Sequence, residues 1–150
     1  MTSPDFHLTF TVDLPAREVF DAIVDPRRWW SGEIRGEADR PGATFTYRYR
    51  DAHRSRQEVT ELEPGRRVVW RVLDSHLSFL AEPDAWSGTE IVFELAERGG
   101  RTEVRFAHRG LTPDCECYGA CSSGWSALVL GNLRRLIASG MPQPDAFAAG

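Results

Sequence analysis

The stretch ECYGACSSGWSALVLGNLRRLIASG, residues 116–140, decides the fold because it is the one long segment of the chain with helical periodicity. We expect its helix to run from about residue 112 to residue 139, with Thr112 as the N-cap and Pro113 in the first turn. Gly140 and Pro142 are expected to end it. One broad face carries the side chains that would pack against another layer, namely Tyr118, Cys121, Ser122, Trp125, Leu128, Val129, Asn132, Leu133 and Leu136.

Upstream of this helix, most of the chain alternates apolar and polar residues with the period of two that is typical of half-buried strands. Residues 14–30 are the exception, because an apolar stripe predicts a helix after Pro15, a break at Asp25-Pro26 and another short turn at residues 27–30. Gly99-Gly100 predicts a tight hairpin. The strand patterns cover residues 6–13, 43–50, 53–65, 66–74, 88–100 and 101–110.

This order of elements predicts an α+β fold. Successive strands joined by short turns should form a curved antiparallel sheet, with two short helices after the first strand. The sheet would wrap around the long C-terminal helix, and that arrangement tends to leave a cavity between helix and sheet. We expect residues 1–140 to form a single domain and residues 141–150 a flexible C-terminal tail.

Composition narrows the classes of function. The 150 residues carry a net charge of −4, with 18 basic residues against 22 acidic ones, which argues against a nucleic-acid partner. The sequence contains no run of 18 apolar residues, so it predicts no membrane span, and the N-terminus lacks the pattern of a signal peptide. We therefore expect a cytoplasmic protein whose thiols stay reduced.

Four stretches resemble a known superfamily over roughly residues 6–140: VVWRVLDSHLSF (68–79), SGTEIVFEL (87–95), TEVRFAHRGL (102–111) and residues 116–140. They are similar to the bacterial branch of the helix-grip, START-like (SRPBCC) superfamily that is related to the activator of the heat-shock protein ninety ATPase. The resemblance implies a hydrophobic cavity that binds lipids, aromatic molecules or other small apolar ligands. It also implies that a few relatives are cyclases, aromatases or hydrolases.

The same resemblance bears on protein partners. The eukaryotic chaperone activator carries an additional N-terminal domain that contacts the chaperone, whereas this chain starts directly at its first strand. We therefore do not expect a chaperone partner. A homodimer remains open.

All three cysteines, Cys115, Cys117 and Cys121, lie within seven residues. Zinc sites usually need four protein ligands, or three plus water, and only His108 is near enough in sequence to join three thiols. A reactive thiolate near the start of the helix is a second interpretation, although neighbouring acidic residues oppose it. We favour the third interpretation, in which the cysteines fill space beside the sheet, and we expect neither a metal nor a cofactor.

Large rings and isolated polar groups on apolar faces identify the candidate ligand-binding residues. Aromatic rings shape apolar pockets, and a few polar side chains then fix the orientation of a ligand. The alternative for each residue is structural, since rings can pack a core and a buried histidine or asparagine can bond its neighbours. Trp86, in the segment between two strands, is expected at the pocket mouth or in surface packing. The candidates are Trp30, Phe45, Tyr47, Trp70, Phe93, Phe106, His108, Cys121, Trp125 and Asn132.

Three hypotheses of function follow. The first is the binding of a small hydrophobic or aromatic ligand, such as a lipid or polyketide-like molecule, in an internal cavity. The second is an enzyme of the cyclase or hydrolase type that uses the same cavity, although no nucleophile elbow or phosphate-binding glycine loop is present. The third is a protein-interaction or chaperone-cofactor module, whose sign would be a filled interior and a large exposed apolar patch.

Overall fold

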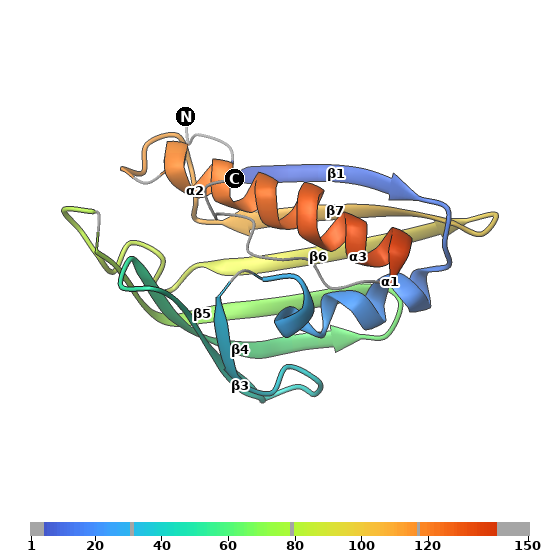
Figure 1. Ribbon diagram of the computed structural model, residues 1–150, viewed down its shortest axis with the longest axis horizontal. Coiled ribbons are helices and arrows are strands. Elements are labelled where there is room, and N and C mark those ends of the chain that lie inside the picture. The colour runs from blue at the N-terminus through green and yellow to red at the C-terminus, as the bar shows by residue number, and fades with distance from the viewer. Residues whose placement is uncertain (1–4, 31, 79, 117, 141–150) are drawn as a thin grey trace.

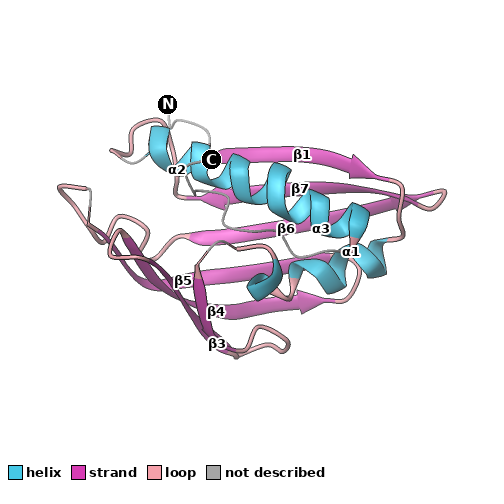
Figure 2. Ribbon diagram, viewed as in Figure 1, coloured by secondary structure: helices cyan, strands magenta, loops and turns pink. Residues whose placement is uncertain are grey.

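The computed structural model describes residues 5–140 except residues 31, 79 and 117. A seven-stranded antiparallel sheet forms one layer, and the helices all lie on one of its faces (Figure 1; Figure 2). The order of strands across the sheet is β1-β7-β6-β5-β4-β3-β2. The strands are β1 (Phe6–Val12), β2 (Glu33–Gly36), β3 (Thr44–Tyr49), β4 (His53–Glu63), β5 (Arg67–Leu77), β6 (Glu90–Arg98) and β7 (Arg101–Arg109).

The strands from β2 to β7 form a meander, since each pairs with the next in sequence. The hairpin between β6 and β7 turns at Gly99 and Gly100, whose φ angles of 60° and 80° suit the tight two-residue turn that the sequence predicts. The first strand forms the edge of the sheet next to β7, because Phe6 in β1 pairs with His108 in β7. The short strand β2 was not among the sequence patterns.

Two irregularities interrupt the pairing of β4 with β5. The register shifts between Arg56 and Gln57 and again between Val59 and Glu61. Extra residues of this kind bend a strand and increase its local twist. The shift at Arg56 and Gln57 therefore helps to curve the part of the sheet where β4 begins and β5 ends.

The C-terminal helix comprises α2 (Tyr118–Trp125), the π-helical segment η2 (Ser126–Leu133) and α3 (Arg134–Ser139). This helix crosses the sheet, and α1 (Ala16–Ile23) packs beside its last segment, α3 (Figure 1). In sequence, α1 is followed by η1 (Pro26–Arg28), a single 3₁₀ turn. Gly140 ends the helix in the left-handed conformation, as expected from the sequence. None of the helices in the described part of the chain is long and apolar enough to cross a membrane.

The prediction that the helix starts near Thr112 is wrong. The N–H of Cys115 donates to the carbonyl of Thr112, and the N–H of Tyr118 donates to the carbonyl of Cys115. Residues 113–116 therefore lie in turns and a bend, and the helix begins at Tyr118. The hydroxyl of Thr112 lies 3.8 Å from the Cys115 sulfur and caps no helix. The π-helical segment was not predicted either. The predicted tail, residues 141–150, lies outside the described residues.

The core lies between the sheet and the C-terminal helix and is rich in aromatic rings. Most of the helix face predicted to pack inward does so: Cys121, Trp125, Leu128, Val129, Asn132, Leu133 and Leu136 are buried. Tyr118 and Ser122, which were predicted on the same face, are partly exposed. The predicted α+β fold, a curved antiparallel sheet with a long C-terminal helix, is confirmed.

Candidate functional site

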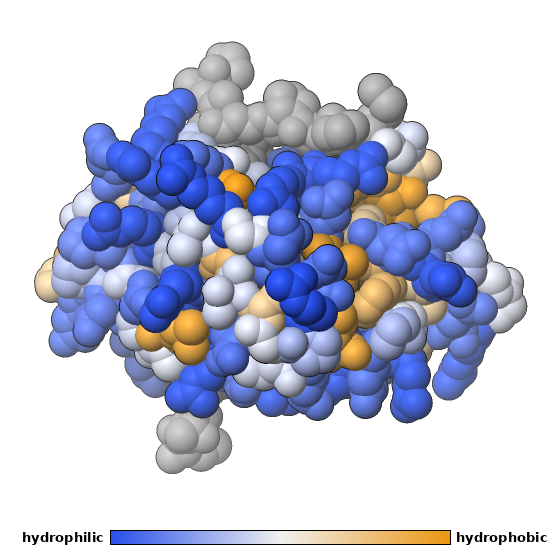
Figure 3. Space-filling model, turned by 90° about the horizontal axis from the view of Figure 1, so that it is seen from below, coloured by the Kyte–Doolittle hydropathy of each residue, from blue (hydrophilic) through white to orange (hydrophobic). Residues whose placement is uncertain are grey.

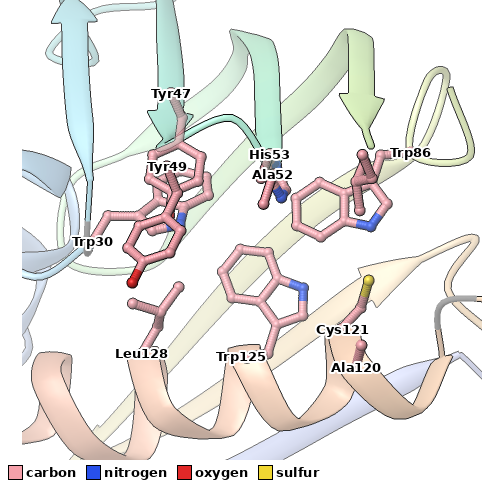
Figure 4. Close-up of a pocket in the computed structure, with 12 residues that line it drawn as sticks. Trp30, Tyr47, Tyr49, Ala52, His53, Trp86, Ala120, Cys121, Trp125 and Leu128 are labelled. Carbon is pink, nitrogen blue, oxygen red and sulfur yellow. The ribbon is translucent and has the colours of Figure 1, made fainter. Parts of the chain in front are cut away.

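An apolar pocket of about 230 Å³ lies between the first half of the C-terminal helix and the curved end of the sheet. We call it the aromatic pocket. Figure 4 shows Trp125, Leu128 and Cys121 on the helix side, facing rings carried by the sheet and by a loop. Its lining residues are Trp30, Tyr47, Tyr49, Ala52, His53, Leu77, Trp86, Ala120, Cys121, Gly124, Trp125 and Leu128.

Simple periodicities bring these side chains together. Cys121, Trp125 and Leu128 are spaced four and three residues apart, so they share one face of the helix. Tyr47 and Tyr49 are two residues apart on β3 and therefore share one face of the sheet. The aromatic pocket forms where that helix face meets that sheet face.

The loop that joins β5 to β6 closes one side of the pocket with Trp86. The indole ring of Trp86 stacks on that of Trp125, with ring centroids 5.5 Å apart and planes 8° apart. Among the hydrogen bonds that hold the loop, the Glu116 carboxylate accepts the N–H of Ala81 at 2.9 Å, and the Ser75 hydroxyl accepts the N–H of Trp86 at 3.1 Å. Trp86 is thus a buried wall residue. The sequence left open whether it would lie at a pocket mouth or pack on the surface.

Both ring nitrogens of His108 are occupied behind this wall. The Trp125 indole N–H donates to Nδ1 at 2.9 Å, so the ring proton lies on Nε2, which donates to the Thr89 hydroxyl at 2.8 Å. That hydroxyl in turn donates to the Trp86 carbonyl at 2.6 Å. Burial, and after it the charge of His53, lower the pKa of His108 to about 3. His108 is therefore a neutral residue that fixes Trp125 and the loop of Trp86.

His53 lies on the wall of the aromatic pocket. Its Nε2 is 3.2 Å from the Ser55 hydroxyl, which also accepts a hydrogen bond from the Gln57 amide at 2.5 Å. Its ring contacts Tyr47 and Trp86 edge to face, with centroids 5.0 Å and 4.5 Å away. Although the residue as a whole is partly exposed, enclosure of the ring lowers the pKa of His53 from 6.5 to about 4.

The pocket is uncharged near neutral pH. No aspartate, glutamate, lysine or arginine is among the described residues that line it, and its histidine is neutral there. Within residues 5–140, leaving out the three undescribed positions, no group of three or more His, Cys, Asp or Glu side chains could hold a metal ion. Cys115 and Cys121 are thiols, and Cys117 lies outside the described residues.

The sequence-predicted binding residues fall into two groups. Trp30, Tyr47, Cys121 and Trp125 line the aromatic pocket. The others lie behind its wall: Phe45, Trp70, Phe93 and Phe106 in the packed aromatic cluster, and His108 and Asn132 in hydrogen bonds to protein groups.

Asn132 shows how a buried polar group can be satisfied without a ligand. Its amide donates to the Trp29 carbonyl at 3.0 Å and so ties the helix to the turn after η1. This is the structural alternative that the sequence left open for it. Contact of Asn132 with a ligand remains a prediction that the geometry does not favour.

Sequence reasoning missed His53 and Leu77, which lie at the start of β4 and the end of β5. The available signal was the alternation in residues 53–59, where His53, Ser55, Gln57 and Val59 share a face. That face includes three polar residues, so the pattern did not identify it as the inner one. Pairing with Leu77 across the strands identifies it in the structure.

A curved antiparallel sheet that holds a C-terminal helix, with an apolar pocket between them, is the helix-grip architecture of START-like proteins. Residues 13–138 match the family described as activator of Hsp90 ATPase homolog 1-like protein, and the chain belongs to this family. None of the curated proteins matches the chain.

Solved structures support the same fold. The chain is similar to the Aha1 dimer from Colwellia psychrerythraea, with 24% sequence identity and a TM-score of 0.72 over 91% of this chain and 98% of that one. CalU16 from Micromonospora echinospora is 23% identical, with a TM-score of 0.63 over 89% of this chain and 76% of that one. DynU16, from the dynemicin biosynthetic locus, is 22% identical with a TM-score of 0.67; the match covers 93% of this chain and 49% of DynU16, so the chain spans about half its length.

Proposed function

We propose that the chain binds a small hydrophobic or aromatic ligand in the aromatic pocket. The observation that carries this proposal is a pocket walled by Trp30, Tyr47, Trp86 and Trp125 in which no described lining residue carries a charge at neutral pH. Affinity would come from burial of apolar surface, at about 25 cal/mol per Å². Large, rigid rings also lose little conformational entropy when they hold a ligand.

The volume of the pocket limits the size of the ligand. An engineered apolar cavity of about 150 Å³ takes up benzene. The 230 Å³ of the aromatic pocket therefore suit a compound of one or two rings. A long acyl chain or a polyketide with several fused rings would require the loop of Trp86 to move outward.

Titration with naphthalene tests the proposal. Binding should change tryptophan fluorescence, because three tryptophans line the pocket, and should raise the melting temperature by mass action. Leu128→Phe should abolish both effects by filling the pocket. Leu130→Phe is the matched control, since Leu130 lies two residues further along the same helix and is exposed.

The proposal fails if naphthalene leaves the fluorescence and the melting temperature of the unmodified chain unchanged at its solubility limit. It also fails if Leu128→Phe binds as well as Leu130→Phe, because binding would then occur elsewhere.

The two alternative functions find less support. His108, the candidate acid or base for an enzyme, has both ring nitrogens engaged by Trp125 and Thr89 and does not line the pocket. For an interaction module, Leu130 is the one large hydrophobic residue that is exposed among the described residues. The face in Figure 3 is mostly hydrophilic, with hydrophobic residues showing between charged ones.

We also propose, independently of ligand binding, that the chain forms a homodimer. The solved Aha1 structure from Colwellia psychrerythraea is a dimer, and the sheet of this chain ends in the unpaired edges of β1 and β2. Light scattering after size-exclusion chromatography, over a hundredfold range of concentration, would decide. A constant mass of 16.9 kDa would contradict the dimer.

A further inference from the structure

Trp86 carries a hydrogen-bond donor that has no acceptor. Its indole Nε1 is buried and makes no hydrogen bond, although the residue is only 5% exposed. Trp86 lines the aromatic pocket, and Figure 4 shows the nitrogen on the ring edge that faces Cys121, another lining residue. The donor thus faces the pocket side.

An indole N–H can only donate, so an acceptor must come to it. A buried donor without a partner costs free energy, and most such groups in proteins are paired. The backbone of Trp86 is already satisfied, because Ser75 accepts its N–H and its carbonyl accepts from Thr89. The indole N–H is therefore the one polar group of Trp86 that is left to recognise something else.

We infer that the ligand of the aromatic pocket is an uncharged compound of one or two rings that carries a hydrogen-bond acceptor, such as a carbonyl or a ring nitrogen, for the N–H of Trp86. This inference rests on the proposed function and adds the chemical class of the ligand. The apolar body of the compound would lie among the rings, and its acceptor would lie at the Trp86 end.

We infer that the ligand is uncharged because the described residues lining the aromatic pocket carry no charge at neutral pH. The described lining residues include no cation that could pair with a carboxylate, and moving an unpaired charge into such a pocket is costly. His53 does not supply that cation, because its pKa of about 4 leaves it neutral at pH 7. A neutral acceptor loses much less hydration and regains a hydrogen bond.

Access to the N–H requires a small movement of Trp86. Water does not reach the nitrogen in the structure, so the acceptor of the ligand must displace the ring slightly as it enters. Trp86 lies on the loop between β5 and β6, which the Glu116 carboxylate ties to the turn before α2. Backbone hydrogen bonds from the N–H of Leu77 to the Pro83 carbonyl and from the N–H of Gly88 to the Val72 carbonyl also hold the loop, so the Trp86 ring must shift while these bonds stay in place.

Calorimetric titration with three compounds of matched size tests the inference: naphthalene without an acceptor, coumarin with a neutral carbonyl, and the anion 2-naphthoate. The chain should bind coumarin about three- to tenfold more tightly than naphthalene, the gain of one hydrogen bond. Trp86→Phe keeps a ring and removes the N–H, so it should abolish that ratio. 2-Naphthoate should bind most weakly.

Trp70→Phe is the matched control. The Nε1 of Trp70 is also buried without an acceptor, but Trp70 does not line the pocket. This variant should therefore keep the preference for coumarin. Thermal unfolding of both variants confirms that they are folded before binding is compared.

Each unfavourable outcome has its own meaning. Equal binding of coumarin and naphthalene by the unmodified chain, or an unchanged ratio in Trp86→Phe, would overturn the role of the Trp86 donor. Binding of 2-naphthoate as tight as that of coumarin would overturn the absence of charge. In both cases naphthalene still binds, whereas failure of all three compounds to bind would instead remove the proposed function itself.

Discussion

Trp125 connects the helix, the sheet and the loop of Trp86. It is 1% exposed, its ring centroid lies 4.8 Å from that of Phe106, and its N–H donates to His108. The same ring stacks on Trp86 and forms part of the pocket wall. One side chain thus contributes to core packing, to a buried hydrogen bond and to the candidate site.

Replacing this ring should therefore be costly. We expect Trp125→Ala to lower the free energy of unfolding by about 3–5 kcal/mol, as for large aromatic truncations in a core. Leu130→Ala, on the exposed side of the same helix, should change it by less than about 0.5–1 kcal/mol. Chemical denaturation measures both, and equal losses would mean that the helix presents a different face to the sheet.

The two enclosed histidines should make stability depend on pH. Folding lowers the pKa of His53 from 6.5 to about 4 and that of His108 to about 3, so between pH 6.5 and 4 the unfolded chain binds more protons than the folded one. The free energy of unfolding must then fall as the pH falls. The slope is at most about 1.4 kcal/mol per pH unit for each histidine, and less for His53, which is partly exposed.

Denaturant titrations at pH 7, 6 and 5 would measure this slope. His53→Gln should reduce it while leaving the contribution of His108. A stability that stays level from pH 7 to pH 5 would show that neither ring is shielded from water in the folded chain.

At the scale of elements, one exposed carboxylate helps to hold the loop between β5 and β6. Glu116 accepts the N–H of Ala81, so Glu116→Ala should release this part of the loop. We expect faster hydrogen exchange at the Ala81 amide and a loss of about 0.5–1.5 kcal/mol in global stability. Glu63→Ala, at the exposed end of β4, is the control and should leave exchange in the loop unchanged. Slow exchange that persists in Glu116→Ala would show that the other hydrogen bonds of the loop hold this part in place.

The long elements could be predicted from the sequence, and the short or irregular ones could not. Alternation over many residues identifies β4 to β7, and the apolar face of the C-terminal helix follows from its period. The four residues of β2 are too few to show a period. The π-helical segment η2 differs from an α-helix in which carbonyl accepts the hydrogen bond of each N–H. The pattern of apolar residues does not encode this difference. The false helix start at Thr112 arose because residues that cap helices also begin turns.

At the scale of the whole molecule, the site depends on curvature that no single segment encodes. The sequence identified Trp125, Cys121, Tyr47 and Trp30, which come from well-marked faces. It could not separate wall from interior: Trp70 and Phe93 share the same inward sheet face as the lining residues but lie in the packed cluster. The register shifts between β4 and β5 and the position of the loop help to determine which rings reach the pocket.

The state of the cysteines belongs to the whole chain, because one of them lies outside the described residues. We expect three free thiols in the unfolded chain and no stoichiometric zinc after purification under reducing conditions. In the folded chain, burial should make Cys121 react more slowly than the partly exposed Cys115. Thiol titration with and without denaturant, together with elemental analysis, would test this. One tightly held zinc ion per chain would contradict the packing role.

The pairing of the first strand with the last has a consequence for biosynthesis. Of the strands, β1 emerges first from the ribosome, and its partner β7 follows nearly a hundred residues later in the sequence. At ordinary elongation rates, β7 is therefore synthesised about 5–20 s after β1. During that time Phe6, Phe10 and Val12 have no sheet or helix to cover them. The nascent chain therefore exposes the apolar face of this strand until translation is almost complete.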